Sequence, residues 1–385
     1  MRFPEFSGEW NKYTINDLAT VVGGGTPDTT VKSYWGGDIQ WFTPSEIGKN
    51  KYVDFSKRTI TRDGLDNSSA KLLPLHTILL SSRATVGECS IASNECTTNQ
   101  GFQSLIAKQC NIDFLYYLIQ TKKKDLIRNA CGSTFLEISA NEIRKIKVAV
   151  PVQNEQEQIA KLLSLIDERI ATQNKIIEKL QSLIKGLVDE LMTVLLKGKL
   201  YPFSSFYIKA GEGGTPTTSV VEYYTEGTIP FIKIEDLSCK YLTSNKDFIT
   251  ELGMQKSSAW LIPSKSVIYS NGATIGAISI NEYPVCTKQG ILGIVPNTNI
   301  NVEYLYLLMS SSYFSKEISR IITEGTMKTA YLKDINHIKC PLPSMAQQKN
   351  ITNLTSSIEE KLSIEQELLR FLNLQKQYLL HMIFI

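Results

Sequence analysis

The sequence predicts an α+β protein. Two mixed α/β domains with β-rich cores, related by a pseudo-twofold axis, are separated by two long antiparallel helices that form a coiled coil. Three observations support this prediction. The tetrapeptide GGTP occurs twice, at 24–27 and at 213–216, in similar surroundings. Each copy contains short β-branched runs bounded by Gly, Pro, Ser and Asn, which are typical of strands. Each copy is followed by a long stretch with apolar residues at heptad spacing, which is typical of coiled coils.

The two copies match in the same order along most of their length. Segment 68–87 aligns without gaps to 257–276, and nine of the twenty positions are identical. CTTNQG then corresponds to CTKQG, FLYYL to YLYLL, and IRKIKVAVP to INHIKCPLP. A repeat of this length is a duplicated domain and not a solenoid unit of about 20–50 residues. We expect a domain at 1–152, a long helix at 153–198, a second domain at 199–343 and a second long helix at 344–385.

Each predicted domain combines strands with one helix. The expected strands are IQWFTP, HTILLSS and CSIAS in the first copy and IPFIKI, SVIYSN and AISI in the second. We expect them to form a curved or partly closed sheet. A helix should follow near 112–128, with its counterpart near 302–322, and each domain should end in an apolar strand and a proline, Pro151 or Pro343.

The two long helices differ in the regularity of their apolar seam. In the first, seam positions run from 159 to 194 in alternating steps of four and three, and all are apolar except Gln173. In the second, the apolar positions are 351, 354, 358, 362, 369, 372, 379 and 383. The steps from 354 to 362 resemble a stutter. Glu365 and Lys376 interrupt this seam, so we expect a partly polar partner helix. Antiparallel pairing would place the domains at opposite ends.

Composition narrows the class of protein. The chain of 385 residues carries 41 basic and 38 acidic side chains, so its near-neutral charge neither indicates nor excludes nucleic-acid binding. Seven scattered cysteines without a CxxC motif predict a reducing cytosol and no disulfide framework. Three histidines lack metal-ligand spacing, so we expect no metal site. There is no signal core and no apolar run of about 20 residues, which predicts a cytoplasmic protein without a membrane partner.

Neither copy of GGTP has the pattern of a phosphate-binding loop. Such loops need GxxxxGK[ST], or GxGxxG at the start of a helix, whereas the first GGTP precedes DTT and an aromatic, strand-like run. We therefore expect GGTP to form a tight turn, because Gly and Pro allow turn dihedrals. The sequence also lacks GxSxG, HExxH and an Asp/Asn-Pro-Pro-aromatic stretch. These absences predict that the chain is not an enzyme by itself.

Together these features resemble the specificity subunit of type I restriction-modification systems. The family likeness lies in the opening RFPEFSGEW, in GGTP, in SSRATVG and SNGATIG followed by NQG and KQG, and in PVQNEQEQIAKLLSLID. It covers essentially the whole chain. One departure is MAQQKNI, where the second long helix lacks the acidic beginning of the first.

The resemblance implies a function in DNA recognition. Each domain would be a target-recognition domain that reads one half of a bipartite double-stranded DNA target. The helices would fix the spacer and dock two methyltransferase subunits, which bind S-adenosylmethionine and methylate adenine N6. A restriction/translocase subunit using ATP and Mg would join for cleavage, and this chain would hold no cofactor. Two alternatives are a structural adaptor with duplicated protein-binding domains on a coiled-coil strut, and a divergent enzyme.

Candidate DNA contacts lie in loops punctuated by glycine. Arg pairs with guanine and Asn or Gln with adenine, while Lys, Ser and Thr contact phosphates. Arg83 aligns with Gly272 in an otherwise matching loop, as expected of domains that read different half-sites. The alternative is ordinary solvated loop polarity. The candidates are Arg83, Thr85, Asn99, Gln100, Lys49, Lys51 and Arg58 in the first domain, and Asn271, Thr274, Lys288 and Gln289 in the second.

Some apolar residues of the first long helix lie off its seam. Leu162, Leu183, Val188 and Leu195 would leave surface to bury against another protein, such as methyltransferase helices. The alternative is a coiled coil within the chain that has no further partner.

Overall fold

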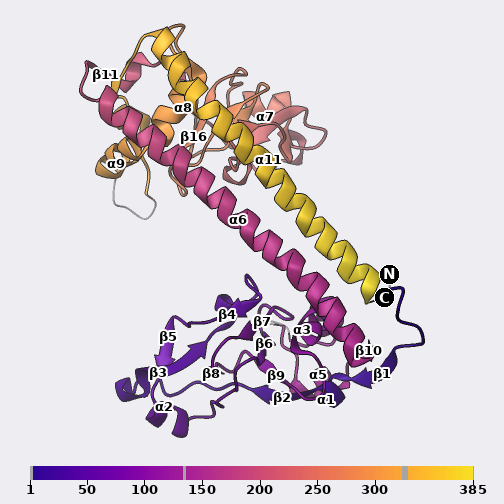
Figure 1. Cartoon of the computed structure of the whole chain (residues 1–385). Helices are drawn as coiled ribbons and strands as arrows, with labels where there is room; N and C mark the ends of the chain where they lie inside the picture. Colours follow the sequence, from indigo (N-terminus) through magenta and orange to yellow (C-terminus); the bar gives the residue numbers. More distant parts are fainter. Residues whose placement is uncertain (1–2, 133–135, 323–327, 385) are drawn as a thin grey trace. The chain divides into compact units, whose positions relative to one another are not determined.

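The structure is a computed structural model that describes residues 3–132, 136–322 and 328–384 (Figure 1). The chain forms two compact units. Unit 1 comprises Met1–Lys175 with Glu367–Ile385, and unit 2 comprises Ile176–Gln366. The division falls inside both long helices, so each unit contains one globular part and a segment of each helix.

Unit 1 has two main sheets and a two-stranded ribbon. The five-stranded sheet has the order β2-β9-β6-β7-β4, and the three-stranded sheet has the order β5-β3-β8. The strands of the first are β2 (Ala19–Gly23), β9 (Gln103–Ala107), β6 (Ile78–Leu80), β7 (Cys89–Ala92) and β4 (Tyr52–Val53). Those of the second are β5 (Arg58–Ile60), β3 (Trp35–Phe42) and β8 (Cys96–Thr98), and the ribbon pairs β1 (Asn11–Thr14) with β10 (Lys147–Val150). The predicted strands are confirmed, although they are divided between two sheets.

Unit 2 repeats this topology strand for strand. Its sheets have the orders β12-β19-β16-β17-β14 and β15-β13-β18, and its ribbon pairs β11 with β20. The strands are β11 (Leu200–Pro202), β12 (Tyr207–Glu212), β13 (Ile229–Ile232), β14 (Tyr241–Leu242), β15 (Asp247–Ile249), β16 (Val267–Ser270), β17 (Ile278–Asn281), β18 (Cys286–Thr287), β19 (Ile291–Pro296) and β20 (Lys339–Pro341). The equivalent pairs β3–β8 and β13–β18 are both parallel. The duplication read from the sequence is therefore a duplication of fold.

Each predicted domain helix is in fact two helices. Helices α3 (Ile112–Thr121) and α4 (Lys123–Arg128) are separated at Lys122, whose φ of −87° and ψ of 5° are not helical. Helices α8 (Val302–Ser310) and α9 (Ser312–Ile321) are separated at Ser311, which is extended and caps α9 by accepting from the Phe314 N–H at 3.2 Å. The shorter helices are α1 (Ile15–Leu18), α2 (Arg62–Asp66), α5 (Ala140–Lys145), α7 (Glu251–Gln255) and α10 (Leu332–Ile335).

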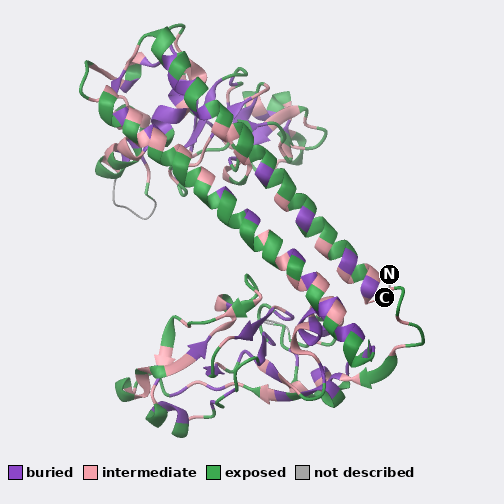
Figure 2. Ribbon diagram, viewed as in Figure 1, coloured by how far each residue is buried: buried purple, intermediate pink, exposed green. Residues whose placement is uncertain are grey.

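The long helices α6 (Gln153–Leu195) and α11 (Met345–Ile383) are antiparallel within each unit. In unit 1, Leu379 near the end of α11 lies in the same core cluster as Leu163 near the start of α6. In unit 2, Ile351 near the start of α11 lies in the same cluster as Met192 near the end of α6. Figure 2 shows buried residues recurring along both helices. No helix within the described residues is long and apolar enough to cross a membrane.

The seam of α11 is more regular than the sequence indicated. Leu354 is 53% exposed, while Thr355 beside it is fully buried. One continuous line of buried and half-buried positions runs 351, 355, 358, 362, 365, 369, 372, 376, 379 and 383, in alternating steps of four and three. The predicted stutter is therefore wrong. Thr355 can occupy the seam because its hydroxyl donates to the Thr352 carbonyl at 3.1 Å.

The seam of α6 changes course near its end. Val194 is 62% exposed, whereas Val188 and Met192 are buried in the core of unit 2. A straight α-helix drifts by about 20° per heptad relative to a strict seven-residue repeat. In unit 2 the helix also packs against the globular part, so a different side of α6 is buried there.

The cysteines allow a simple test of the fold. All seven thiols are free, and only Cys131 and Cys239 are exposed. Burial raises the pKa of Cys89 to about 12 and that of Cys286 to about 11, so these thiols stay protonated near neutral pH. We expect iodoacetamide to modify two thiols rapidly in the native protein and all seven after denaturation. Mass spectrometry of tryptic peptides measures this, and rapid native labelling of Cys96 or Cys340 would contradict the core described here.

Candidate nucleic-acid interface

Four loops of unit 1 meet at one edge of its sheets. The Gly25 N–H donates to the Thr98 carbonyl at 2.8 Å, which holds GGTP against the end of β8. The Ser82 N–H donates to the Gly101 carbonyl at 2.9 Å, and the Ile138 N–H donates to the Ser82 carbonyl at 2.9 Å. Segments 24–27, 81–87, 99–101 and 136–138 therefore form one cluster, called here loop set 1.

Unit 2 forms the same cluster. The Gly214 N–H donates to the Thr287 carbonyl at 3.0 Å, and the Asn271 N–H donates to the Gly290 carbonyl at 3.0 Å. The Ala330 N–H donates to the Asn271 carbonyl at 2.9 Å. Segments 213–216, 270–276, 288–290 and 328–330 are called loop set 2.

The GGTP glycines allow two backbone segments to approach closely. A Cβ added at Gly24 would lie 2.0 Å from the Asn99 carbonyl oxygen, and one at Gly213 would lie 2.1 Å from the Thr287 carbonyl oxygen. Neither glycine has a positive φ, and residues 24–28 form no turn. The predicted tight turn is therefore wrong. Glycine is required at these positions because a side chain would clash with the neighbouring backbone, and not because the backbone dihedrals are unusual.

The threonine of each GGTP contacts the glutamine loop. The Thr26 hydroxyl donates to the Gln100 side-chain oxygen. In unit 2 the Thr215 hydroxyl accepts from the Gln289 N–H at 3.4 Å. Gln100 and Gln289 are both exposed. The repeated motif thus supports the loop that presents one of the candidate base-reading amides.

Loop set 1 brings together four of the predicted residues. Arg83 is half-exposed, and its Nε lies 3.6 Å from Glu137 Oε2. Thr85 is exposed, and its hydroxyl lies 2.9 Å from that of Ser81. The Asn99 side-chain oxygen accepts from the Gly101 N–H at 2.9 Å. In loop set 2, the predicted residues Thr274, Lys288 and Gln289 are exposed.

Two predicted DNA contacts are instead buried structural residues. Asn271 is 1% exposed, and its amide donates to the Ala330 carbonyl at 3.1 Å. Lys51 has only 10% of its side chain exposed, and its ammonium lies 2.8 Å from Asp113 Oδ1. Both side chains are used to tie segments of the fold together, so neither is presented to a ligand.

Two further predicted contacts lie outside loop set 1. Lys49 is exposed in the loop before β4. Arg58 on β5 stacks its guanidinium 3.6 Å from the centroid of the Trp35 ring. Trp35 in turn packs edge-on against Trp41, whose indole N–H donates to the Gly25 carbonyl at 3.0 Å. Both tryptophans are thus used in packing within the fold.

A buried glutamine joins each globular part to its long helix, and sequence reasoning missed both. The Gln156 side chain accepts from the Asn111 N–H at 3.0 Å and donates to the Pro151 carbonyl at 3.0 Å. Gln348 accepts from the Asn301 N–H at 2.7 Å and donates to the Pro343 carbonyl at 2.9 Å. The divergent segment MAQQKNI thus retains the glutamine that joins the globular part to α11. The sequence could have indicated this role, because each glutamine follows a proline by five residues.

Three of the four predicted partner-binding residues are buried or partly buried. Val188 is 4% exposed in the core of unit 2, and Leu162 and Leu195 are partly buried against the two cores. Only Leu183, at 55% exposure, presents apolar surface. The sequence placed these residues on a free surface because they lie outside the seam. Where α6 packs against a globular part, however, it also buries side chains outside its seam.

Apolar surface occurs instead on one face of α11. In unit 1, Leu368, Phe371, Leu374 and Tyr378 are between 44% and 59% exposed. Spacings of three and four residues place them on one side of the helix, away from the seam. We call these four residues the apolar stripe.

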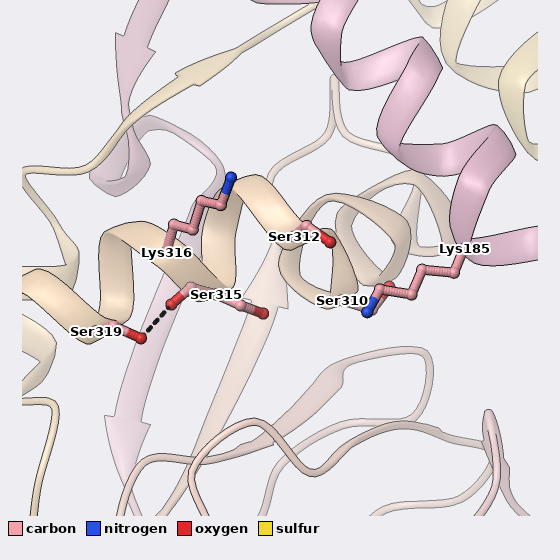
Figure 3. Close-up of a pocket in the computed structure, with 6 residues that line it drawn as sticks. All are labelled: Lys185, Ser310, Ser312, Ser315, Lys316 and Ser319. Atoms are coloured by element: carbon pink, nitrogen blue, oxygen red, sulfur yellow. Dashed lines mark hydrogen bonds between the residues drawn. The ribbon is translucent and has the colours of Figure 1, made fainter. Parts of the chain in front are cut away.

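The structure also has a shallow polar pocket of about 300 Å³ in unit 2 (Figure 3). The Ser312 hydroxyl donates to Asp189 at 2.6 Å, and the Ser319 hydroxyl donates to the Ser315 carbonyl at 2.9 Å. These hydroxyls are engaged as donors within the fold and do not form an activated nucleophile. The lining residues are Lys185, Ser310, Ser312, Ser315, Lys316 and Ser319.

Two similar loop sets, each on a β-rich domain attached to long helices, define a duplicated recognition protein. The family model for the type I restriction modification DNA specificity domain matches residues 7–182 and 206–373. The chain therefore belongs to this family and contains its DNA specificity domain twice.

Individual relatives agree with this assignment. The type I restriction enzyme MjaIX specificity subunit of Methanocaldococcus jannaschii is 29% identical over 382 residues, covering 92% of this chain and 88% of the relative. The EcoR124I/EcoR124II specificity subunit of Escherichia coli is 28% identical over 175 residues, covering 43% of each chain. The crystal structure of an S subunit from M. genitalium shares the fold with a TM-score of 0.56 at 19% identity, covering 100% of this chain and 99% of that one.

Proposed function

We propose that this chain is a non-catalytic specificity subunit in which each unit reads one half of a bipartite duplex DNA target. The observation that supports this most strongly is the repetition of one loop architecture with different exposed side chains. Arg83 corresponds to Gly272, and Asn99 corresponds to Lys288, within otherwise matching loops. A shared scaffold with altered side chains suits two readers of different sequences.

The chemistry of the loop sets suits base reading. Arg83 can donate two hydrogen bonds to guanine O6 and N7, and the Gln100 and Gln289 amides can pair with adenine. Thr85, Thr274, Lys288 and Lys49 can contact phosphates, which fix position without reading sequence. Glu137 holds the Arg83 side chain near the loop surface while leaving it half-exposed.

The partners follow from the family. Two methyltransferase subunits would supply S-adenosylmethionine and methylate adenine, and the long helices would set the spacer and dock them. A restriction/translocase subunit with ATP and Mg would complete a cleaving complex in the cytoplasm. The relative from M. jannaschii supports this proposal, since its name describes it as the specificity subunit of a restriction enzyme. The apolar stripe is the surface we assign to a partner, because exposed apolar patches mark interaction sites.

The test is methylome sequencing of cells that express the chain with its methyltransferase. We expect a methylated adenine motif in two parts separated by a fixed spacer. Replacing Arg83 and Gln100 with alanine should weaken reading of one half only. Each base contact contributes about 1–3 kcal/mol, so methylation of the original motif should fall at least about tenfold.

Arg128→Ala is a matched control, because Arg128 is an exposed arginine of unit 1 outside loop set 1. It should leave the motif unchanged. A methylated motif with only one part, or equal loss of both parts in the Arg83/Gln100 variant, would count against the proposal.

A further inference from the structure

A buried lysine attaches the globular part of unit 1 to its long helix. The Lys51 ammonium donates to the Ser164 hydroxyl on α6 at 2.6 Å and to the Tyr117 hydroxyl on α3 at 3.2 Å, and it pairs with Asp113 at 2.8 Å. Tyr52 adds a bond of 2.8 Å from its hydroxyl to Asp113. One ammonium thus links the loop before β4, helix α3 and helix α6.

Unit 2 has the same device 189 positions later. The Lys240 ammonium lies 2.5 Å from Glu359 on α11 and 3.7 Å from Glu303 on α8. Only 13% of the Lys240 side chain is exposed. Tyr241 repeats the role of Tyr52, since its hydroxyl donates to Glu303 at 2.7 Å. In each unit the lysine therefore bonds to the globular part and to a long helix.

The two junctions differ in how their charges are balanced. In unit 1, Lys376 on α11 pairs with Asp167 on α6 at 2.7 Å, and the Tyr117 hydroxyl donates to the same carboxylate at 2.7 Å. Unit 1 therefore has two lysines for two aspartates. In unit 2, Lys240 alone pairs with both glutamates. Removing Lys240 would leave two neighbouring carboxylates without this partner, so unit 2 should be the more sensitive junction.

We propose that Lys51 and Lys240 are positioning residues that fix the angle of each globular part on its own segment of the long helices. Apolar contacts also join these parts, but hydrophobic burial has no preferred direction. Charge-assisted hydrogen bonds to several acceptors, in contrast, have a preferred direction. Since each globular part carries a loop set, this angle determines where the loop set points along DNA. The lysines would then help to determine which spacer lengths are accepted, an inference that rests on the proposed function.

The experiment uses the chain assembled with its methyltransferase and DNA duplexes with constant half-sites. The spacer is lengthened or shortened by one or two base pairs. One base pair moves a half-site by about 3.4 Å and rotates it by about 35°, so the unchanged chain should methylate one spacer length best. For Lys51→Met and Lys240→Met, we expect methylation of spacers one base pair off, relative to the optimum, to rise at least about fivefold. Lys240→Met should show the larger change.

Several comparisons keep the test specific. Lys145→Met and Lys265→Met remove exposed lysines that form other ion pairs, and they should leave the spacer profile unchanged. Ser164→Ala removes one acceptor of Lys51, and Glu303→Gln removes one negative charge facing Lys240, so both provide milder variants if a methionine variant fails to fold. They should broaden the profile to a smaller extent.

The two ideas can fail separately. If the unchanged chain methylates no two-part site, the proposed function is wrong. If the unchanged chain has a sharp spacer optimum, and the variants at Lys51, Lys240, Ser164 and Glu303 all retain that optimum with only a uniform loss of rate, the lysines are merely structural. This inference is then overturned.

Discussion

Gly24→Ala should destabilise unit 1 by about 3 kcal/mol or more, because overpacking costs typically 1–3 kcal/mol and this clash is with backbone. The new Cβ would lie 2.0 Å from the Asn99 carbonyl oxygen and 2.5 Å from that of Thr98. Neither oxygen can move without disturbing β8 and the loop that carries Gln100. Loop set 1 should therefore be lost before the rest of the chain unfolds.

The effect should be confined to one unit, so the measurement must resolve the two. Hydrogen exchange followed by mass spectrometry reports protection for each segment separately. In Gly24→Ala, protection should fall in β8 and in the core of unit 1, while β18 of unit 2 stays protected. Gly213→Ala should give the reverse pattern, because its Cβ would meet Thr287.

Gly186→Ala is the matched control. A Cβ at Gly186 meets nothing within 4 Å, and the residue lies inside α6. Alanine should stabilise the helix there by up to about 1 kcal/mol. Equal tolerance of alanine at Gly24 and Gly186 would contradict the close approach of the two segments.

The duplication could be predicted from the sequence because it depends on local pattern. The GGTP repeat, the strands at HTILLSS and SVIYSN, and the heptads of α6 each reflect spacing along the chain. The repeat and the strands are confirmed, and the α6 seam is confirmed except near its end, where Val194 is exposed. The antiparallel pairing followed from chain connectivity. Lys376 was expected to meet a polar partner, and it pairs with Asp167.

The errors concern side chains whose surroundings come from distant segments. Asn271 was expected to contact DNA, but it is buried and its amide donates to the carbonyl of Ala330 in another segment. Lys51 was also expected to contact DNA, and nothing nearby in the sequence indicates Ser164 on α6 as its partner. Comparing the two copies was the available signal, since Lys-Tyr occurs at 51–52 and again at 240–241.

The largest loss of assembly should follow from charging the apolar stripe. Leu368→Asp with Phe371→Asp replaces two half-exposed apolar side chains of α11 that lie off its seam. Interface hot spots contribute about 2 kcal/mol or more each, so methyltransferase affinity should fall at least about 100-fold if the stripe is the docking surface. Folding should persist, because both side chains are already exposed. Surface plasmon resonance with purified methyltransferase measures the change.

Asn373→Asp tests whether any added charge on α11 has this effect. Asn373 is exposed and is not three or four residues from any residue of the apolar stripe, so its replacement should leave affinity within about twofold, as expected for a site outside a hot spot. Self-association of the isolated chain provides a second measurement, since an uncovered apolar stripe favours self-association. Light scattering should therefore show a smaller average mass for the double variant than for the unchanged chain. Undiminished methyltransferase binding by the double variant would place the docking surface elsewhere, and the exposed Leu183 of unit 2 would then be the next position to charge.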